Sequence, residues 1–123
     1  MSYIKRISLF IIFFTIITVF IGAVSANNWT VNPGDSIQAT INNASVNDTI
    51  NVNDNDSNYT YTENLIINKT LTLKTTGNVT IITPNPSIST IIINSDGNGS
   101  TIQGFIIKGA TGTGKSGICL DTT

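Results

Sequence analysis

Short apolar segments that return at regular intervals constrain the fold of this chain most. Four of them begin at residues 50, 71, 91 and 118, which are 21, 20 and 27 residues apart. They read Ile50-Asn51-Val52, Leu71-Thr72-Leu73, Ile91-Ile92-Ile93 and Ile118-Cys119-Leu120. Side chains alternate in direction along a strand, so the first and third residues of each segment share one face. The pattern predicts short strands whose middle residues, Asn51, Thr72 and Ile92, face outward.

A second apolar series lies between these segments. It consists of Leu65–Ile67, Val79–Ile82 and Ile102–Ile107, with Asn, Asp, Gly and Pro in the intervening turns. Repeats of this length with two or three strands each are typical of a solenoid, in which stacked coils bury a continuous apolar column. An antiparallel β-sandwich also spaces short strands closely. The return of the aliphatic pairs at coil-like intervals favours the solenoid.

One segment has a helical pattern instead. Ile37, Ile41 and Ala44 are spaced so that they share one face of a helix. Asp35 precedes them as a possible N-cap, and Gln38 stands three residues later, as in a capping box. We expect a short helix over residues 36–43.

The first 26 residues have the layout of a signal peptide. Lys5 and Arg6 precede an apolar run from Ile7 to Ile21, and Ala23-Val24-Ser25-Ala26 supplies small residues for cleavage after Ala26. The alternative is an uncleaved membrane anchor, although the run of 15 residues is shorter than the roughly 20 that span a bilayer. Either way, the sequence predicts a protein that is secreted or held at the cell surface.

Three segments carry a resemblance to a known fold. Residues 36–41 are similar to the helical cap, residues 48–73 to the opening coil, and residues 100–109 to a coil segment of the right-handed parallel β-helix proteins of the pectate-lyase-like superfold. Together with the signal peptide and the bias toward Asn, Thr and Ile, the chain resembles the adhesin-like surface proteins of methanogenic archaea. The resemblance implies an all-β fold with a short N-terminal capping helix and about three coils.

These observations suggest three parts: a signal peptide over 1–26, an N-terminal strand and capping helix over 27–48, and β-helix coils over 49–123. We expect Ile118-Cys119-Leu120 to begin a fourth coil. Because solenoids normally end in a polar cap, we also expect the sequence to be a fragment of a longer product, or a truncated one.

The charges argue against several functions. After residue 26 the chain carries four Lys, seven acids, no Arg and no His, so its surface would not attract nucleic acid. Gly109 to Ser116 matches the P-loop pattern, but Gly117 and a strand-like segment follow where a helix should begin. We interpret it as a loop between coils. The acids are dispersed and map onto no catalytic cluster, so we expect no enzymatic activity and no required cofactor.

Further candidate sites lie between residues 54 and 61. Asp54, Asp56 and Asn58 alternate like the first calcium ligands of an EF-hand loop, but Tyr59 and Leu65 occupy its Gly and Glu positions. A solvated turn is the alternative to weak calcium binding. Eight Asn-x-Ser/Thr sequons are present, and we expect glycosylation at Asn55 and Asn58. The sequons begin at Asn28, Asn43, Asn47, Asn55, Asn58, Asn68, Asn78 and Asn98.

Two functions remain open on the sequence. The first is a structural or adhesive surface module that contacts carbohydrate or other cells, with Tyr59 and Tyr61 as exposed contact aromatics; packing of the first long loop is their alternative role. The second is the N-terminal part of a secreted polysaccharide lyase or glycoside hydrolase whose active site lies downstream. Membrane association would require an uncleaved signal anchor or a further C-terminal region.

Overall fold

The computed structural model describes residues 25–122 and shows a predominantly β structure with a single short α-helix in that range. The predicted signal peptide lies outside the described residues except for Ser25 and Ala26, which are exposed. None of the described helices is long and apolar enough to cross a membrane. The elements are β1 (Asn28–Val31), α2 (Ile37–Asn43), β2 (Thr49–Val52), β3 (Thr60–Thr62), β4 (Leu65–Ile67), β5 (Thr72–Lys74), β6 (Thr80–Ile82), β7 (Ile91–Asn94), the 3₁₀ turn η1 (Ser95–Gly97), β8 (Thr101–Gln103), β9 (Ile106–Lys108) and β10 (Ile118–Asp121).

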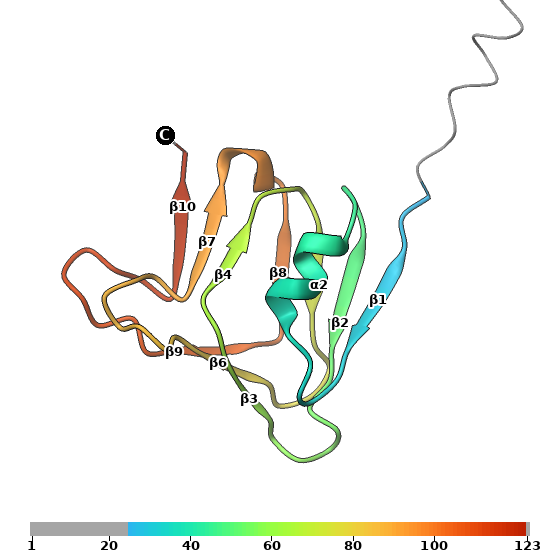
Figure 1. The fold of residues 1–123 in the computed structure, drawn as a ribbon, viewed down its shortest axis with the longest axis horizontal. Helices are drawn as coiled ribbons and strands as arrows, with labels where there is room; N and C mark the ends of the chain where they lie inside the picture. Colours follow the sequence, from blue (N-terminus) through green and yellow to red (C-terminus); the bar gives the residue numbers. More distant parts are fainter. Residues whose placement is uncertain (1–24, 123) are drawn as a thin grey trace, which may run out of the picture.

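The strands form three parallel sheets (Figure 1). Sheet A has the order β1-β2-β5-β8, sheet B has β3-β6-β9, and sheet C has β4-β7-β10. From β2 onward the chain therefore passes through sheets A, B and C in that order three times, and we call these passes the first, second and third layers. Strand β1 precedes the first pass and pairs with β2 in sheet A. All strand pairs given by the described residues are parallel. This arrangement is compatible with the predicted β-helix and differs from the antiparallel sandwich.

The predicted equivalence of the four aliphatic segments is wrong in part. Ile50 pairs with Leu73 rather than with Leu71, a shift of two residues that keeps the same side chains inward. Ile91 belongs to sheet C, where it pairs with Leu65 and Ile118. The four segments are thus divided between sheets A and C. The sequence does not distinguish the two sheets, because a strand of either sheet can carry two aliphatic residues separated by one residue.

Two further details correct the predicted organisation. The segment Ile118–Asp121 completes the third layer in sheet C and does not begin a fourth coil. The apolar pattern does not predict strand β3, because its inward Tyr61 stands between two Thr and lacks the aliphatic pair.

The apolar core lies between the three sheets. The flanking residues of the predicted segments are buried in the first two layers, whereas Asn51, Thr72 and Ile92 are partly exposed, which confirms the predicted alternation. The fully buried large side chains are Val31, Ile37, Ile41, Ile50, Val52, Leu65, Ile67, Leu71, Leu73, Val79, Ile81 and Ile91. Each buried aliphatic side chain stabilises the fold by about 1.5–3 kcal/mol relative to an exposed one.

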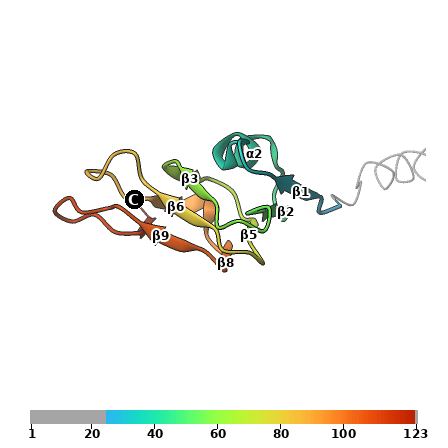
Figure 2. The same ribbon diagram turned by 90° about the horizontal axis from the view of Figure 1, so that it is seen from below.

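Helix α2 covers one end of the stack (Figure 2), as predicted, and polar side chains fix it there. Glu63, which follows β3, accepts hydrogen bonds from the backbone N–H of Ile37 (2.9 Å) and of Gln38 (3.0 Å) at the start of the helix. Lys69 donates to the carbonyl of Ala44 at its other end (2.8 Å). Because opposite charges face the two ends of the helix, they complement its dipole.

The N-cap is Ser36, not the expected Asp35. The Ser36 hydroxyl accepts a hydrogen bond from the backbone N–H of Ala39 (3.1 Å). Asp35 instead accepts from the N–H of Asn32 (2.9 Å) and so closes the turn before the helix. The sequence has two capping residues in a row, and the helix begins after the second.

A buried carboxylate joins the segment around β1 to the loop that follows α2. Asp48 accepts hydrogen bonds from the backbone N–H of Asn27 (2.7 Å), the indole N–H of Trp29 (2.8 Å) and the backbone N–H of Ser45 (2.8 Å). These bonds hold the pKa of Asp48 below its usual 3.8, and the bond from Asn27 is the largest cause. Asp48 therefore links β1, β2 and the loop after α2.

Replacement of Glu63 by Ala should lower the free energy of unfolding by about 1–2 kcal/mol, because two helix N–H groups lose a charged acceptor. Urea unfolding followed by circular dichroism measures this change. Asp96→Ala removes the same charge from an exposed position and serves as the control. Equal stability of the two variants would contradict the capping role.

Candidate functional site

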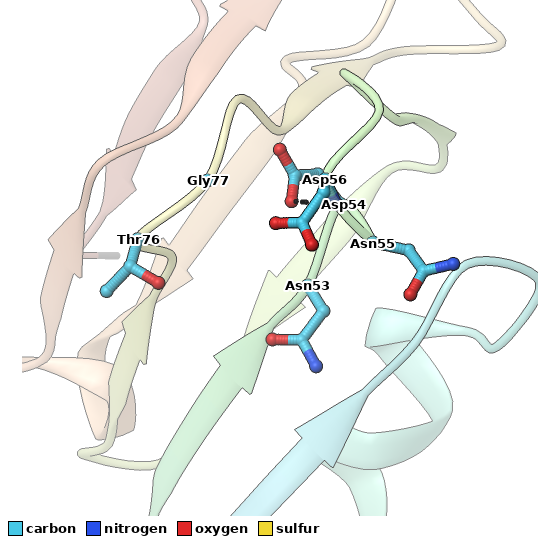
Figure 3. Close-up of a pocket in the computed structure, with 6 residues that line it drawn as sticks. All are labelled: Asn53, Asp54, Asn55, Asp56, Thr76 and Gly77. Carbon is cyan, nitrogen blue, oxygen red and sulfur yellow. Dashed lines mark hydrogen bonds between the residues drawn. The ribbon is translucent and has the colours of Figure 1, made fainter.

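The sequence-predicted site residues lie around the turn between β2 and β3. A hollow of about 300 Å³ opens there, between this turn and the turn that joins β5 to β6. Figure 3 shows Asp54 and Asp56 on the side of Gly77, whereas Asn55 points away. The hollow is lined by Asn53, Asp54, Asn55, Asp56, Thr76 and Gly77. It is a polar surface depression between two neighbouring layers.

Asp54 binds these two layers together. Its carboxylate accepts hydrogen bonds from the backbone N–H of Asn78 (2.7 Å) in the second layer and from that of Asp56 (3.1 Å) in its own turn. The bond from Asn78 is the main reason why the pKa of Asp54 lies below its usual 3.8. Gly77 allows this approach, because a Cβ at that position would overlap the Asp54 carboxylate.

The predicted calcium ligands are unequal in their surroundings. Asp54 is 9 % exposed and both of its oxygens accept backbone hydrogen bonds, whereas Asp56 and Asn58 are exposed to solvent. Within residues 25–122 no three acidic, His or Cys side chains are grouped so that they could hold a metal ion. The geometry supports the alternative that Asp54 organises a solvated turn, and calcium binding stays a prediction.

The same turn bends through left-handed backbone. Asn55, Asp56 and Asn58 all have positive φ angles, between 53° and 60°. Asn and Asp tolerate this conformation better than other non-Gly residues. The turn therefore holds the side chains of Asn55 and Asn58 in solvent, where a glycan could be attached; their glycosylation stays a prediction.

The expectation that Tyr61 is an exposed contact residue is wrong. Its side chain is 3 % exposed, and its hydroxyl donates to the carbonyl of Asn53 (2.9 Å). Burial, with nearby Tyr59 and acidic side chains, raises the pKa of Tyr61 to about 12. The half-buried Tyr59 ring meets it edge to face, with the ring centroids 4.8 Å apart. Tyr61 points inward because it pairs in register with Ile81 of the second layer.

The segment with the P-loop pattern forms an exposed loop between β9 and β10. It joins sheet B to sheet C within the third layer, rather than one coil to the next. The backbone N–H of Lys115 donates to the carbonyl of Gly112 (3.0 Å) within the loop. A strand follows, as the sequence predicts, and not the helix that a P-loop requires.

The sequence predicts that Asn51 and Thr72 face outward but does not reveal the regular polar surface on sheet A to which they belong. We call this surface the polar ladder; it consists of the outward side chains of β1, β2, β5 and β8. The strand register aligns one column of Asn28, Thr49, Thr72 and Thr101, and a second column of Thr30, Asn51, Lys74 and Gln103. All eight are exposed or partly exposed. Their spacing in the sequence is irregular, so only the register brings them together.

No protein-family model matches the chain, and neither the curated proteins nor the solved structures include a match.

Replacement of Asp54 by Asn should lower the melting temperature at neutral pH, because the amide cannot accept both backbone N–H groups as well as the carboxylate does. The folded-state pKa of Asp54 is below 3.8, so its stabilising effect is present above that pH and is lost as the pH falls through the folded-state value. The difference in melting temperature between the unchanged protein and Asp54→Asn should therefore become smaller in acid. Thermal melts over a pH series measure it.

Asp56→Asn is the matched control, because Asp56 lies in the same turn but is exposed. It should leave the melting temperature at neutral pH unchanged. If the melting temperature of Asp54→Asn stays below that of the unchanged protein by the same amount in acid, the role assigned to the ionised carboxylate is contradicted.

Proposed function

We propose that this chain is an exported, non-enzymatic surface module, built as a right-handed parallel β-helix, that contacts carbohydrate. The observation that supports this proposal best is the polar ladder on sheet A. It presents two columns of hydroxyl and amide side chains with one cation, Lys74, among them. Hydroxyl and amide groups both donate and accept hydrogen bonds, as sugar hydroxyls do.

The spacing of the ladder suits a repeating ligand. Neighbouring strands lie about 4.8 Å apart, so each column repeats its polar group at that interval. The sugar rings of an extended glycan also present hydroxyls at a regular interval of comparable length. Because the side chains stand on a hydrogen-bonded sheet, little conformational freedom would be lost on binding.

The composition of the ladder favours a neutral glycan over a charged partner. Lys74 is its only charged member, and the Thr residues of the first column have side chains that are restricted at χ1. Thr49, Thr72 and Thr101 lie in register on three successive strands. They form the most regular part of the surface and are its best candidates for direct contact.

Export is the second part of the proposal. It rests on the basic, apolar and small-residue segments of residues 1–26. Export also suits a surface that is rich in Asn, Ser and Thr and carries several sequons, because sequons accept glycans in exported proteins. The adhesin-like resemblance of the sequence points to the same location, the cell surface.

The triple variant Thr49→Val, Thr72→Val and Thr101→Val should weaken binding to a neutral polysaccharide by about tenfold or more. It removes three hydroxyls but keeps their shape and strand preference, and each lost hydrogen bond costs about 0.5–1.5 kcal/mol. Depletion from solution by insoluble cellulose and chitin measures the affinity.

Thr60→Val, Thr62→Val and Thr80→Val provide the matched control on sheet B, where these residues face outward. This control should bind as the unchanged protein does. Equal losses in both triple variants, or no binding by the unchanged protein, would overturn the ladder as a glycan site.

Expression in a secreting host should yield an extracellular protein that begins at Asn27. Mass spectrometry of the intact product identifies the N-terminus and any attached glycan. Ala26→Trp should block cleavage at this point, because a large side chain replaces the small residue that cleavage requires. Asn27→Gln should leave cleavage unchanged and is the control. Recovery of the unchanged protein inside the cell with Met1 retained would contradict export.

A further inference from the structure

The asparagines of the eight sequons differ from most other asparagines of the chain. All eight are exposed, and within residues 25–122 no hydrogen bond involves any of their side chains. Six asparagines outside sequons do use their side chains in hydrogen bonds: Asn32, Asn42, Asn51, Asn53, Asn64 and Asn85. The fold therefore employs the amides of most other asparagines and leaves the sequon amides in solvent.

Six of the sequon asparagines lie in two rows, one at each end of the strands of sheet A. The leading row precedes β2, β5 and β8 and consists of Asn47, Asn68 and Asn98. The trailing row follows β2 and β5 and consists of Asn55, Asn58 and Asn78. The polar ladder lies between the two rows. The turns that join sheet B to sheet C within residues 25–122 contain no sequon, because Pro86 follows Asn85 and excludes one.

Hydrogen bonds between layers hold the leading row together. The backbone N–H of Asn47 donates to the carbonyl of Thr70 (2.8 Å), which is the third residue of the Asn68 sequon. The Thr70 hydroxyl in turn donates to the carbonyl of Asn98 (2.8 Å). The three turns thus contact one another from layer to layer, while their Asn side chains remain exposed.

The trailing row is fixed by the carboxylate that joins the first two layers. Asp54 accepts a hydrogen bond from the backbone N–H of Asn78 (2.7 Å) and so brings this turn beside its own. Asn55 and Asn58 stand in the Asp54 turn with positive φ angles of 53°. Both rows are therefore built on turns of defined geometry whose Asn amides the fold does not use.

We propose that both rows are N-glycosylated, so that attached glycans frame sheet A on two sides. The inference rests on the export half of the proposed function, and it adds Asn47, Asn68, Asn78 and Asn98 to the two sites expected from the sequence. The donor is an oligosaccharide carried on a polyprenyl phosphate, and the exporting cell supplies it with its transferase. The Asn Nδ2 atom forms a bond to the anomeric carbon, the bond from that carbon to the phosphate oxygen breaks, and the amide loses one proton as the lipid phosphate leaves.

The sequon hydroxyls indicate when the transfer takes place. The Ser100 hydroxyl accepts from the backbone N–H of Leu71 (3.0 Å) and donates to the carbonyl of Lys69 (3.2 Å). The Thr70 hydroxyl is also bonded. Because the hydroxyl residue is part of the sequon, transfer at Asn68 and Asn98 precedes folding. The folded structure then accommodates these glycans, since both Asn side chains lie in solvent.

Expression of the full chain in a secreting eukaryotic host tests the proposal. Peptide-N-glycosidase converts each glycosylated Asn to Asp, and peptide mass spectrometry locates the converted residues in the secreted and the cell-associated protein. Most copies should carry glycans at Asn47, Asn68, Asn78 and Asn98. Bare side chains at these four positions, with or without glycans at Asn55 and Asn58, would overturn the two rows.

A second version, in which the host's own signal peptide replaces residues 1–26, separates this proposal from export. Failure of the first version alone to leave the cell would contradict export by this chain, whereas the second version still reports on the rows. Asn68→Gln with Asn98→Gln should remove two glycans and leave the melting temperature of protein made without glycosylation unchanged. These substitutions keep Thr70 and Ser100, which bond successive layers.

A new sequon at a bonded asparagine provides the matched control. Ile66→Thr creates one at Asn64, whose amide donates to the Thr83 hydroxyl (2.7 Å) and the Ser89 carbonyl (3.0 Å). A glycan there displaces both bonds, so this variant should be secreted in lower yield than Ile66→Val, which creates no sequon. Equal yields with Asn64 glycosylated would show that the fold does not distinguish the sequon asparagines from the others.

Discussion

The structure depends on the parallel, in-register pairing of strands from successive layers. In sheet A, Ile50, Leu73 and Ile102 lie above one another, and so do Thr49, Thr72 and Thr101. Because side chains alternate along each strand, one register creates both the apolar column inside and the polar ladder outside. A slip by one residue would exchange the two faces. The core and the candidate contact surface are therefore two results of a single constraint.

Polar groups in the turns hold the layers at this register. Asp54 connects the first two layers through Asn78, and Gly77 leaves the room that this contact needs. Gly104 serves a similar purpose in the third layer: its φ angle is 91°, and a Cβ would overlap the Thr75 carbonyl oxygen of the second layer. The layers are thus joined by short turns of defined geometry in addition to the sheets, and α2 closes only one end.

Alternation and helical spacing predict much of this fold, but neither can assign strands to sheets. The inward positions of Ile50, Val52 and Leu73 and the location of the helix follow from local pattern. The pairing of Ile50 with Leu73 depends on turn lengths, which differ from layer to layer, so the predicted pairing is wrong by two residues. Asp54 is recognisable as a polar turn residue, whereas the burial of Tyr61 and the polar ladder become visible only once the register is known.

The most direct test is nuclear magnetic resonance of isotopically labelled protein. Parallel in-register pairing predicts nuclear Overhauser contacts between backbone amide and Hα protons of β2 and β5, and of β5 and β8, centred on Ile50, Leu73 and Ile102. Antiparallel pairing brings Hα protons of neighbouring strands close together. Such Hα–Hα contacts should be absent between these strands. Observation of such Hα–Hα contacts would contradict the stacked arrangement and the polar ladder that depends on it.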